Sequence, residues 1–254
     1  MKVIRLIFVA RWRRTLLAMR IGAFLWTVGV QAVMMASCDD GPVLPQQQVA
    51  GDVGRTVHLK ARIKGTASWS EYYQVVLAGF AESEFAVTQA AVTPQADGTV
   101  EMVLTGVPDQ VKAVELCVTN TLRKRIYTFA RMELGAGDAN SLELDAGDVA
   151  AGMLDVIQAE LFNKSCMQCH GGSTTPAAGL LLLEGKSHAS LVQQPSTQVA
   201  GGVRVIPGDA ANSVLHQTIA EGNVLGFPFS HEHMITAKDR LRLIDEWIDN
   251  GAPE

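Results

Sequence analysis

The first 38 residues contain no acidic side chain, because the first carboxylate of the chain belongs to Asp39. Six basic residues precede an apolar run, 21–37, that ends in small residues: Lys2, Arg5, Arg11, Arg13, Arg14 and Arg20. A basic region followed by an apolar stretch and small residues is the layout of a secretory signal peptide. We therefore predict that residues 1–37 are a signal peptide, with Met19 as an alternative start and an uncleaved anchor helix as an alternative fate.

Without that segment the chain has no excess of basic residues. Removing six of its 21 Lys and Arg leaves 15 against 26 Asp and Glu, a formal net charge of −11. Nucleic-acid binding is improbable on this ground, because a phosphate backbone requires a basic footprint. A partner protein with a basic docking face would instead be attracted to such a surface.

Cysteine is scarce, with four in the whole chain. The stretch Met35-Ala36-Ser37-Cys38 resembles a bacterial lipobox, although leucine is usual where Met35 stands. We therefore predict that Cys38 is acylated and anchors the protein to a membrane, the alternative being a plain cleaved signal. Cys117 lies in an alternating apolar pattern, which indicates a buried, inert thiol.

The other two cysteines belong to Cys166-Met167-Gln168-Cys169-His170, which has the Cys-x-x-Cys-His attachment pattern of a c-type haem. Two sulfurs on one helical turn can reach the two vinyl groups of one porphyrin, and the histidine can bind its iron. Three alternatives are a thioredoxin-like redox pair, a zinc site completed by His231 and His233, and a local disulfide. A redox pair requires a strand before the motif, whereas the preceding residues read as helical.

The middle of the chain has a period of two. About seven short apolar-polar segments alternate with turn residues: 56–63, 73–80, 86–92, 100–104, 114–118, 127–130 and 142–144. This pattern predicts an all-β sandwich of the immunoglobulin or fibronectin III kind over 52–146, joined by a tether, 38–51, to the N-terminal segment. We find no catalytic constellation in it.

Helical periodicity begins near Asp148, a candidate helix cap, and continues through apolar residues spaced at three and four up to Cys166. A second apolar stripe runs from Leu241 to Ile248, after a candidate capping pair of Thr236 and Asp239, and ends at Gly251. The sequence therefore predicts a multi-domain chain with an all-α domain over 147–254.

This last segment resembles the class I cytochrome c domains of bacterial envelope proteins, including the planctomycete type. The resemblance rests on the haem motif and on three downstream stretches: Gly179-Leu180, Pro207-Gly208-Asp209 before 212–215, and Trp247-Ile248-Asp249-Asn250-Gly251-Ala252. It implies one covalent haem c, with His170 as proximal iron ligand and a methionine as distal ligand. Met234 is favoured for that role, with His231 and His233 as alternatives, because Ile235 stands where the family usually has proline.

A haem with both axial positions filled passes single electrons and does not readily bind substrate. We therefore expect a monohaem electron carrier, not an enzyme, held by its lipid in the cell envelope on the periplasmic side or the cell surface. Its partner would be a redox protein. One alternative is a haem-containing sensory or binding lipoprotein with a labile distal ligand, and another is a structural lipoprotein without haem.

Overall fold

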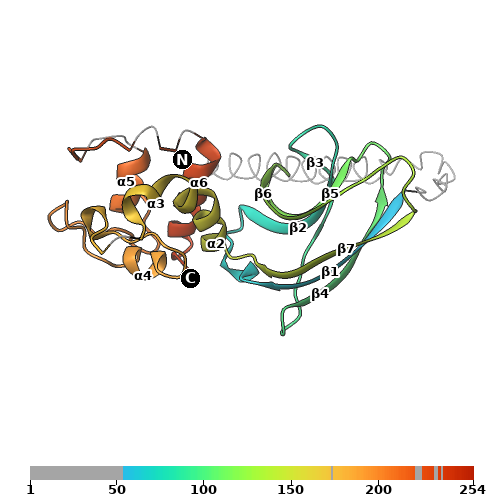
Figure 1. Ribbon diagram of the computed structural model, residues 1–254, viewed down its shortest axis with the longest axis horizontal. Coiled ribbons are helices and arrows are strands. Elements are labelled where there is room, and N and C mark those ends of the chain that lie inside the picture. Colours follow the sequence, from blue (N-terminus) through green and yellow to red (C-terminus); the bar gives the residue numbers. More distant parts are fainter. Residues whose placement is uncertain (1–53, 173, 221–224, 232–233, 236) are drawn as a thin grey trace, which may run out of the picture. The chain divides into compact units, whose positions relative to one another are not determined.

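The computed structural model describes residues 54–254 except 173, 221–224, 232–233 and 236 (Figure 1). The predicted signal peptide, the tether and Cys38 lie outside the described residues, as does His233. The segment Asp52–Glu254 forms one compact unit that holds both the strands and the helices.

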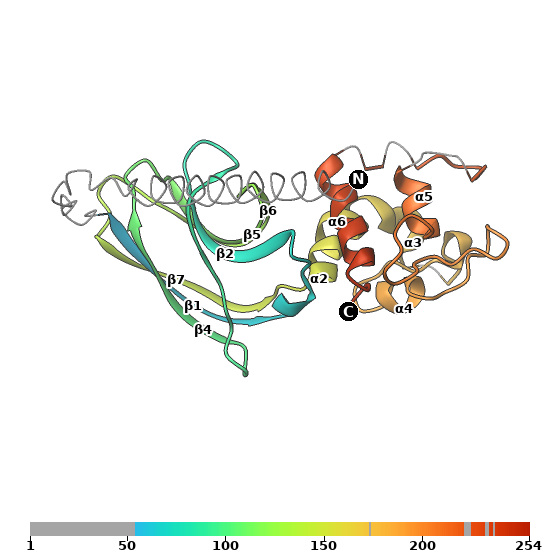
Figure 2. The same cartoon turned by 180° about the vertical axis from the view of Figure 1, so that it is seen from behind.

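The strands form two sheets. They are β1 (Arg55–Lys64), β2 (Tyr73–Phe80), β3 (Ala86–Ala91), β4 (Thr99–Val107), β5 (Ala113–Asn120), β6 (Arg125–Glu133) and β7 (Ser141–Ala150). One sheet has the order β4-β1-β7 and the other β3-β2-β5-β6, and the two views show them as separate curved layers (Figures 1 and 2). The alternation in 56–63 has the predicted effect, since Val57, Leu59 and Ile63 are buried in β1.

The two sheets share an apolar core. Leu59 of β1 and Leu144 of β7 belong to the same buried cluster as Leu77 of β2 and Leu116 of β5. Both faces of β5 are buried, so that Cys117 on its other side is also inaccessible. The prediction of a buried thiol at Cys117 is thereby confirmed, and burial raises its pKa.

The first and last strands are parallel neighbours. β1 pairs antiparallel with β4 on one side and parallel with β7 on the other, with Leu59 opposite Leu144. In a constant-type immunoglobulin sandwich, the first, second, fourth and fifth strands share one sheet. Here the first strand lies between the fourth and the seventh, so the immunoglobulin or fibronectin III prediction is wrong.

The helices are short. They are α2 (Met153–Ile157), the π-helical η2 (Gln158–Cys166), α3 (Met167–His170), α4 (Ser187–Leu191), α5 (Val214–Ala220) and α6 (Lys238–Asp249), with 3₁₀ turns η1 (Thr66–Ser68) and η3 (Ala177–Gly179). The longest α-helix described, α6, has 12 residues, and much of 171–213 is irregular. Among the described helices, none combines the length and apolarity needed to cross a membrane.

The prediction of a separate all-α cytochrome c domain is therefore wrong, since the described chain is mainly β and its helices belong to the same compact unit. Asp148 does not cap a helix. It lies in β7 opposite Arg62, and the predicted boundary between 146 and 147 falls inside that strand. The polar residues of β7 suggested a strand end, but pairing with β1 extends the strand through them.

The N-terminus of α2 is capped by a side chain of the η1 turn. The N–H of Met153 donates to Oγ of Ser68, 2.7 Å away and 85 residues earlier, and the N–H of Gly152 donates to the Asp155 carboxylate. The Trp69 indole donates to the Ala151 carbonyl at 2.7 Å, and Asn250 after α6 donates to the carbonyl of Ser68. The η1 turn between β1 and β2 thus binds both ends of the helical segment.

Candidate functional site

The Cys-x-x-Cys-His motif lies at the end of one continuous helical run. Cys166 ends η2 and is half-buried against the hydrophobic core, whereas Cys169 in α3 is exposed. Their spacing of three places both sulfurs on one side of a single turn. A π-helical stretch widens the turn immediately before them, a feature that often occurs at functional sites.

The structure around the motif bears on two of the alternatives to haem attachment, namely the thioredoxin-like redox pair and the local disulfide. The residues before Cys166 are helical, as predicted, whereas a thioredoxin-like pair would follow a strand. Cys166 and Cys169 are free thiols, and burial raises the pKa of Cys166 to about 11. A thiol that stays protonated at neutral pH is a poor nucleophile, which does not favour a reactive redox pair.

The imidazole of His170 is oriented by a backbone carbonyl. Its Nδ1 lies 3.0 Å from the oxygen of Ala177 in η3, and because a carbonyl only accepts, Nδ1 carries the proton. The lone pair is then on Nε2, the tautomer and orientation found in metal-binding histidines. The chain after His170 folds back on the motif, since the N–H of Leu182 donates to the His170 carbonyl.

Arg204 holds the η3 turn that supplies this carbonyl. Its guanidinium donates from Nη2 to the carbonyls of Ala178 and Gly179, at 3.1 and 3.2 Å, and from Nη1 to the carbonyl of Ser190 at 2.8 Å. Arg204 therefore connects its own irregular segment to η3 and to α4 (Ser187–Leu191). This role could not be predicted from the sequence, because a lone arginine carries no recognisable pattern.

A second imidazole lies beside His170. The ring centroids of His170 and His231 are 6.3 Å apart with their planes 29° apart, and the Phe229 ring meets His231 edge-on at 5.1 Å. Nδ1 of His231 is buried and has no hydrogen-bond partner. Burial, with a smaller contribution from His170, lowers the pKa of His231, and a backbone hydrogen bond to Phe229 partly offsets this shift.

Met234, the favoured distal ligand, lies one turn beyond His231. Its N–H donates to the His231 carbonyl at 2.9 Å, and its partly buried side chain packs against the hydrophobic core. Within the described part of the chain, no three His, Cys, Asp or Glu side chains gather closely enough to hold a metal ion by themselves.

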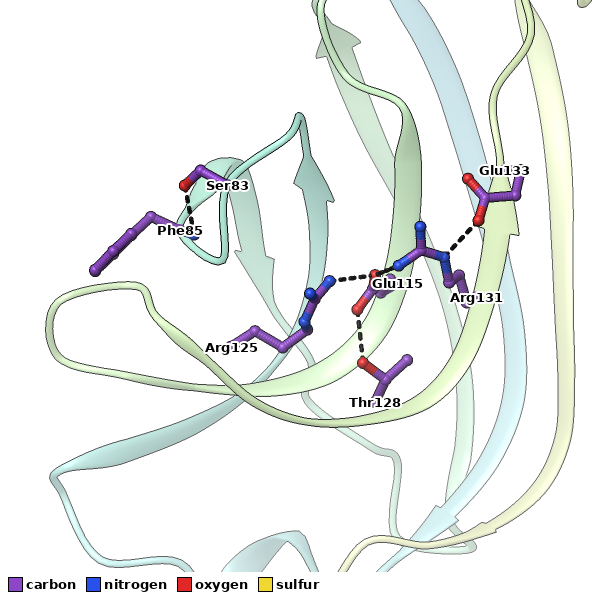
Figure 3. A network of polar contacts seen from close by, with 7 residues as sticks. All are labelled: Ser83, Phe85, Glu115, Arg125, Thr128, Arg131 and Glu133. Atoms are coloured by element: carbon purple, nitrogen blue, oxygen red, sulfur yellow. Dashed lines mark hydrogen bonds and ion pairs between the residues drawn. The ribbon is translucent and has the colours of Figure 1, made fainter. Parts of the chain in front are cut away.

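A polar network that the sequence did not predict lies on the four-stranded sheet (Figure 3). The fully buried carboxylate of Glu115 accepts from Arg125 at 2.7 Å, Arg131 at 2.6 Å and Thr128 at 2.6 Å. Glu133 adds a further bond to Arg131 at 2.7 Å. The sequence feature that could have indicated it is a glutamate between the apolar residues Val114 and Leu116. Both oxygens of Glu115 are bonded, and removing the two arginines would leave an uncompensated charge inside the sheet.

The comparisons with known proteins add no assignment: no protein-family model, curated protein or solved structure matches the chain.

Proposed function

We propose that this protein carries one covalent c-type haem on Cys166 and Cys169, with His170 as proximal iron ligand, and that it transfers single electrons in the cell envelope. The hydrogen bond between Nδ1 of His170 and the Ala177 carbonyl is the observation that carries the proposal. A histidine directly after the cysteines, with its Nε2 lone pair fixed by a second-shell carbonyl, is prepared to bind a metal.

The residues fit the chemistry of attachment. Each thiol adds across one vinyl group: a C–S bond forms, the thiol proton goes to the other vinyl carbon, and no external oxidant or reductant is needed. When bound, the haem iron supplies a one-electron couple, which the axial ligands and surrounding apolar packing tune.

The setting follows from the N-terminal sequence. Haem c is attached outside the cytoplasm, which agrees with an export signal over 1–37 and a lipid anchor at Cys38. The net charge of −11 predicted for the chain without that signal favours a redox partner with a basic docking face.

Replacing both Cys166 and Cys169 with alanine should abolish covalent haem, because no sulfur then remains at the motif. The measurement is a haem stain of the denatured protein after electrophoresis. The matched control is Cys117→Ala, which removes a buried thiol far along the chain and should retain the stain. Haem that stays attached to the denatured double variant would show that these sulfurs are not the attachment points.

Replacing Cys38 with serine should release the protein from membranes or leave its signal unprocessed, because serine cannot be acylated by this route. Stable anchoring takes about two lipid signals, and lipoprotein modification supplies more than one acyl chain. The measurements are membrane fractionation and incorporation of labelled fatty acid. An unchanged membrane fraction together with an unlabelled wild-type protein would rule out the lipid anchor.

A further inference from the structure

The strongest unexplained feature beside the motif is the imidazole of His231. A buried nitrogen without a hydrogen-bond partner is destabilising, and native proteins keep few such groups. Nδ1 of His231 is one of these, in a side chain whose ring lies 6.3 Å from that of His170. The proximity to a proposed iron ligand suggests what the unpaired nitrogen is for.

The spacing matches two imidazoles that share one metal ion. An imidazole nitrogen binds a metal at about 2 Å, and the ring centroid lies about 1 Å behind it, so opposed rings have centroids about 6 Å apart. The observed 6.3 Å falls at this separation. We infer that His231, not Met234, is the distal axial ligand, which makes the site bis-histidine. This inference rests on the proposed haem function.

The surroundings of Met234 and His231 also favour His231 as the distal ligand. Met234 packs against the hydrophobic core, where a thioether is stable without a hydrogen bond or a metal. Its burial therefore needs no ligand to explain it, whereas that of the His231 nitrogen does. The edge-on Phe229 ring also restricts the His231 imidazole, which reduces the entropy lost on ligation.

A second imidazole in place of a thioether changes the redox function. Methionine favours ferrous haem and raises the potential, whereas two imidazoles give a lower one. The protein would thus act at the low-potential end of a chain of carriers. Both axial positions would be filled by firm nitrogen ligands, which excludes gas binding at the resting site.

The test uses the full-length, haem-loaded protein. The oxidised wild type should be low-spin and should lack the long-wavelength band from sulfur-to-iron charge transfer. His231→Ala should convert it to a high-spin form, admit carbon monoxide to the reduced iron, and return to low-spin when imidazole is added. Met234→Leu, which conserves side-chain volume, should change none of these spectra, and neither should His58→Ala, a matched control on the exposed side of β1.

Each other outcome overturns the inference. A sulfur band in the wild type that Met234→Leu abolishes would assign the distal position to the methionine, and a loss of the low-spin form in His233→Ala alone would assign it to that histidine. Wild-type spectra decide between nitrogen and sulfur even if a variant fails to fold. A wild-type protein without covalent haem would overturn the proposed function as well, whereas a haem with another ligand would leave it standing.

Discussion

Trp247→Ala should lower the free energy of unfolding by about 3–5 kcal/mol. Trp247 is fully buried in α6, among the largest side chains of the core, and its indole donates to the Pro253 carbonyl at 2.8 Å. Alanine removes the apolar contacts and leaves a cavity and an unpaired carbonyl. Urea denaturation followed by circular dichroism would measure the loss.

The controls for Trp247 separate packing from hydrogen bonding. Trp247→Phe keeps most of the apolar volume and should cost clearly less, whereas Leu122→Ala, at a side chain that is 70% exposed, should stay within about 0.5 kcal/mol of wild type. Because Asp52–Glu254 is one compact unit, sheets and helices should unfold in one transition. Separate transitions, or a Trp247→Ala effect below about 1 kcal/mol, would contradict this view of the core.

Arg125→Ala combined with Arg131→Ala should destabilise the protein by about 3–5 kcal/mol, because the buried Glu115 carboxylate would lose both cations. Each single substitution should cost about 1 kcal/mol, since one partner remains and both arginines are partly solvated, with 28% and 45% of their side chains exposed. The effects should therefore be strongly non-additive, which a double-mutant cycle in urea would measure.

A third substitution distinguishes an unpaired charge from lost packing. Glu115→Leu on the double-alanine background should restore most of the stability, since apolar side chains often replace a buried ion pair without loss. Glu115→Leu alone should lower the free energy of unfolding by less than the double-alanine substitution does, because Arg125 and Arg131 can turn to solvent. If the two arginine substitutions simply add, or the leucine fails to rescue, water reaches Glu115 and the network contributes little.

The strands were largely predictable and their arrangement was not. Alternation in 56–63 reports one buried face, which is a local property. The pairing of β1 with β7 joins positions about 85 residues apart, such as Leu59 and Leu144, and no local pattern carries that information. For the same reason Asp148 reads as a helix cap, although it is a strand residue once β1 is beside it.

The apolar stripes in the sequence correctly predicted helices, but they did not predict how those helices are arranged. Leu243, Ile244, Trp247 and Ile248 are buried on α6 as predicted, and Gly251 adopts the positive φ of 91° that follows the helix end. An apolar stripe shows that a helix packs against something. It does not show whether that helix belongs to a separate domain or, as here, to the same compact unit as the two sheets.

Some residues of the candidate site could likewise be predicted from the sequence, and others could not. Cys166, Cys169 and His170 were identifiable because the motif is contiguous, whereas the Ala177 carbonyl and Arg204 act through backbone geometry that a sequence does not display. His231 was one of three candidates within four residues, and its ring position distinguishes it from Met234. Glu115 was overlooked because its partners come from another strand.

On the proposed function, the hydrogen bond that Ser68 supplies to α2 links haem attachment to the folding of the first strands. The Asp155 carboxylate caps α2 from within by accepting from the N–H of Gly152, whereas the N–H of Met153 depends on a hydroxyl that η1 brings from between β1 and β2. A fragment that began at Ala151 would contain the whole attachment motif and yet lack this hydroxyl. On the proposed function, the enzyme that ligates haem would act on a chain whose first strands are already folded, and a truncated chain would be a poor substrate for it.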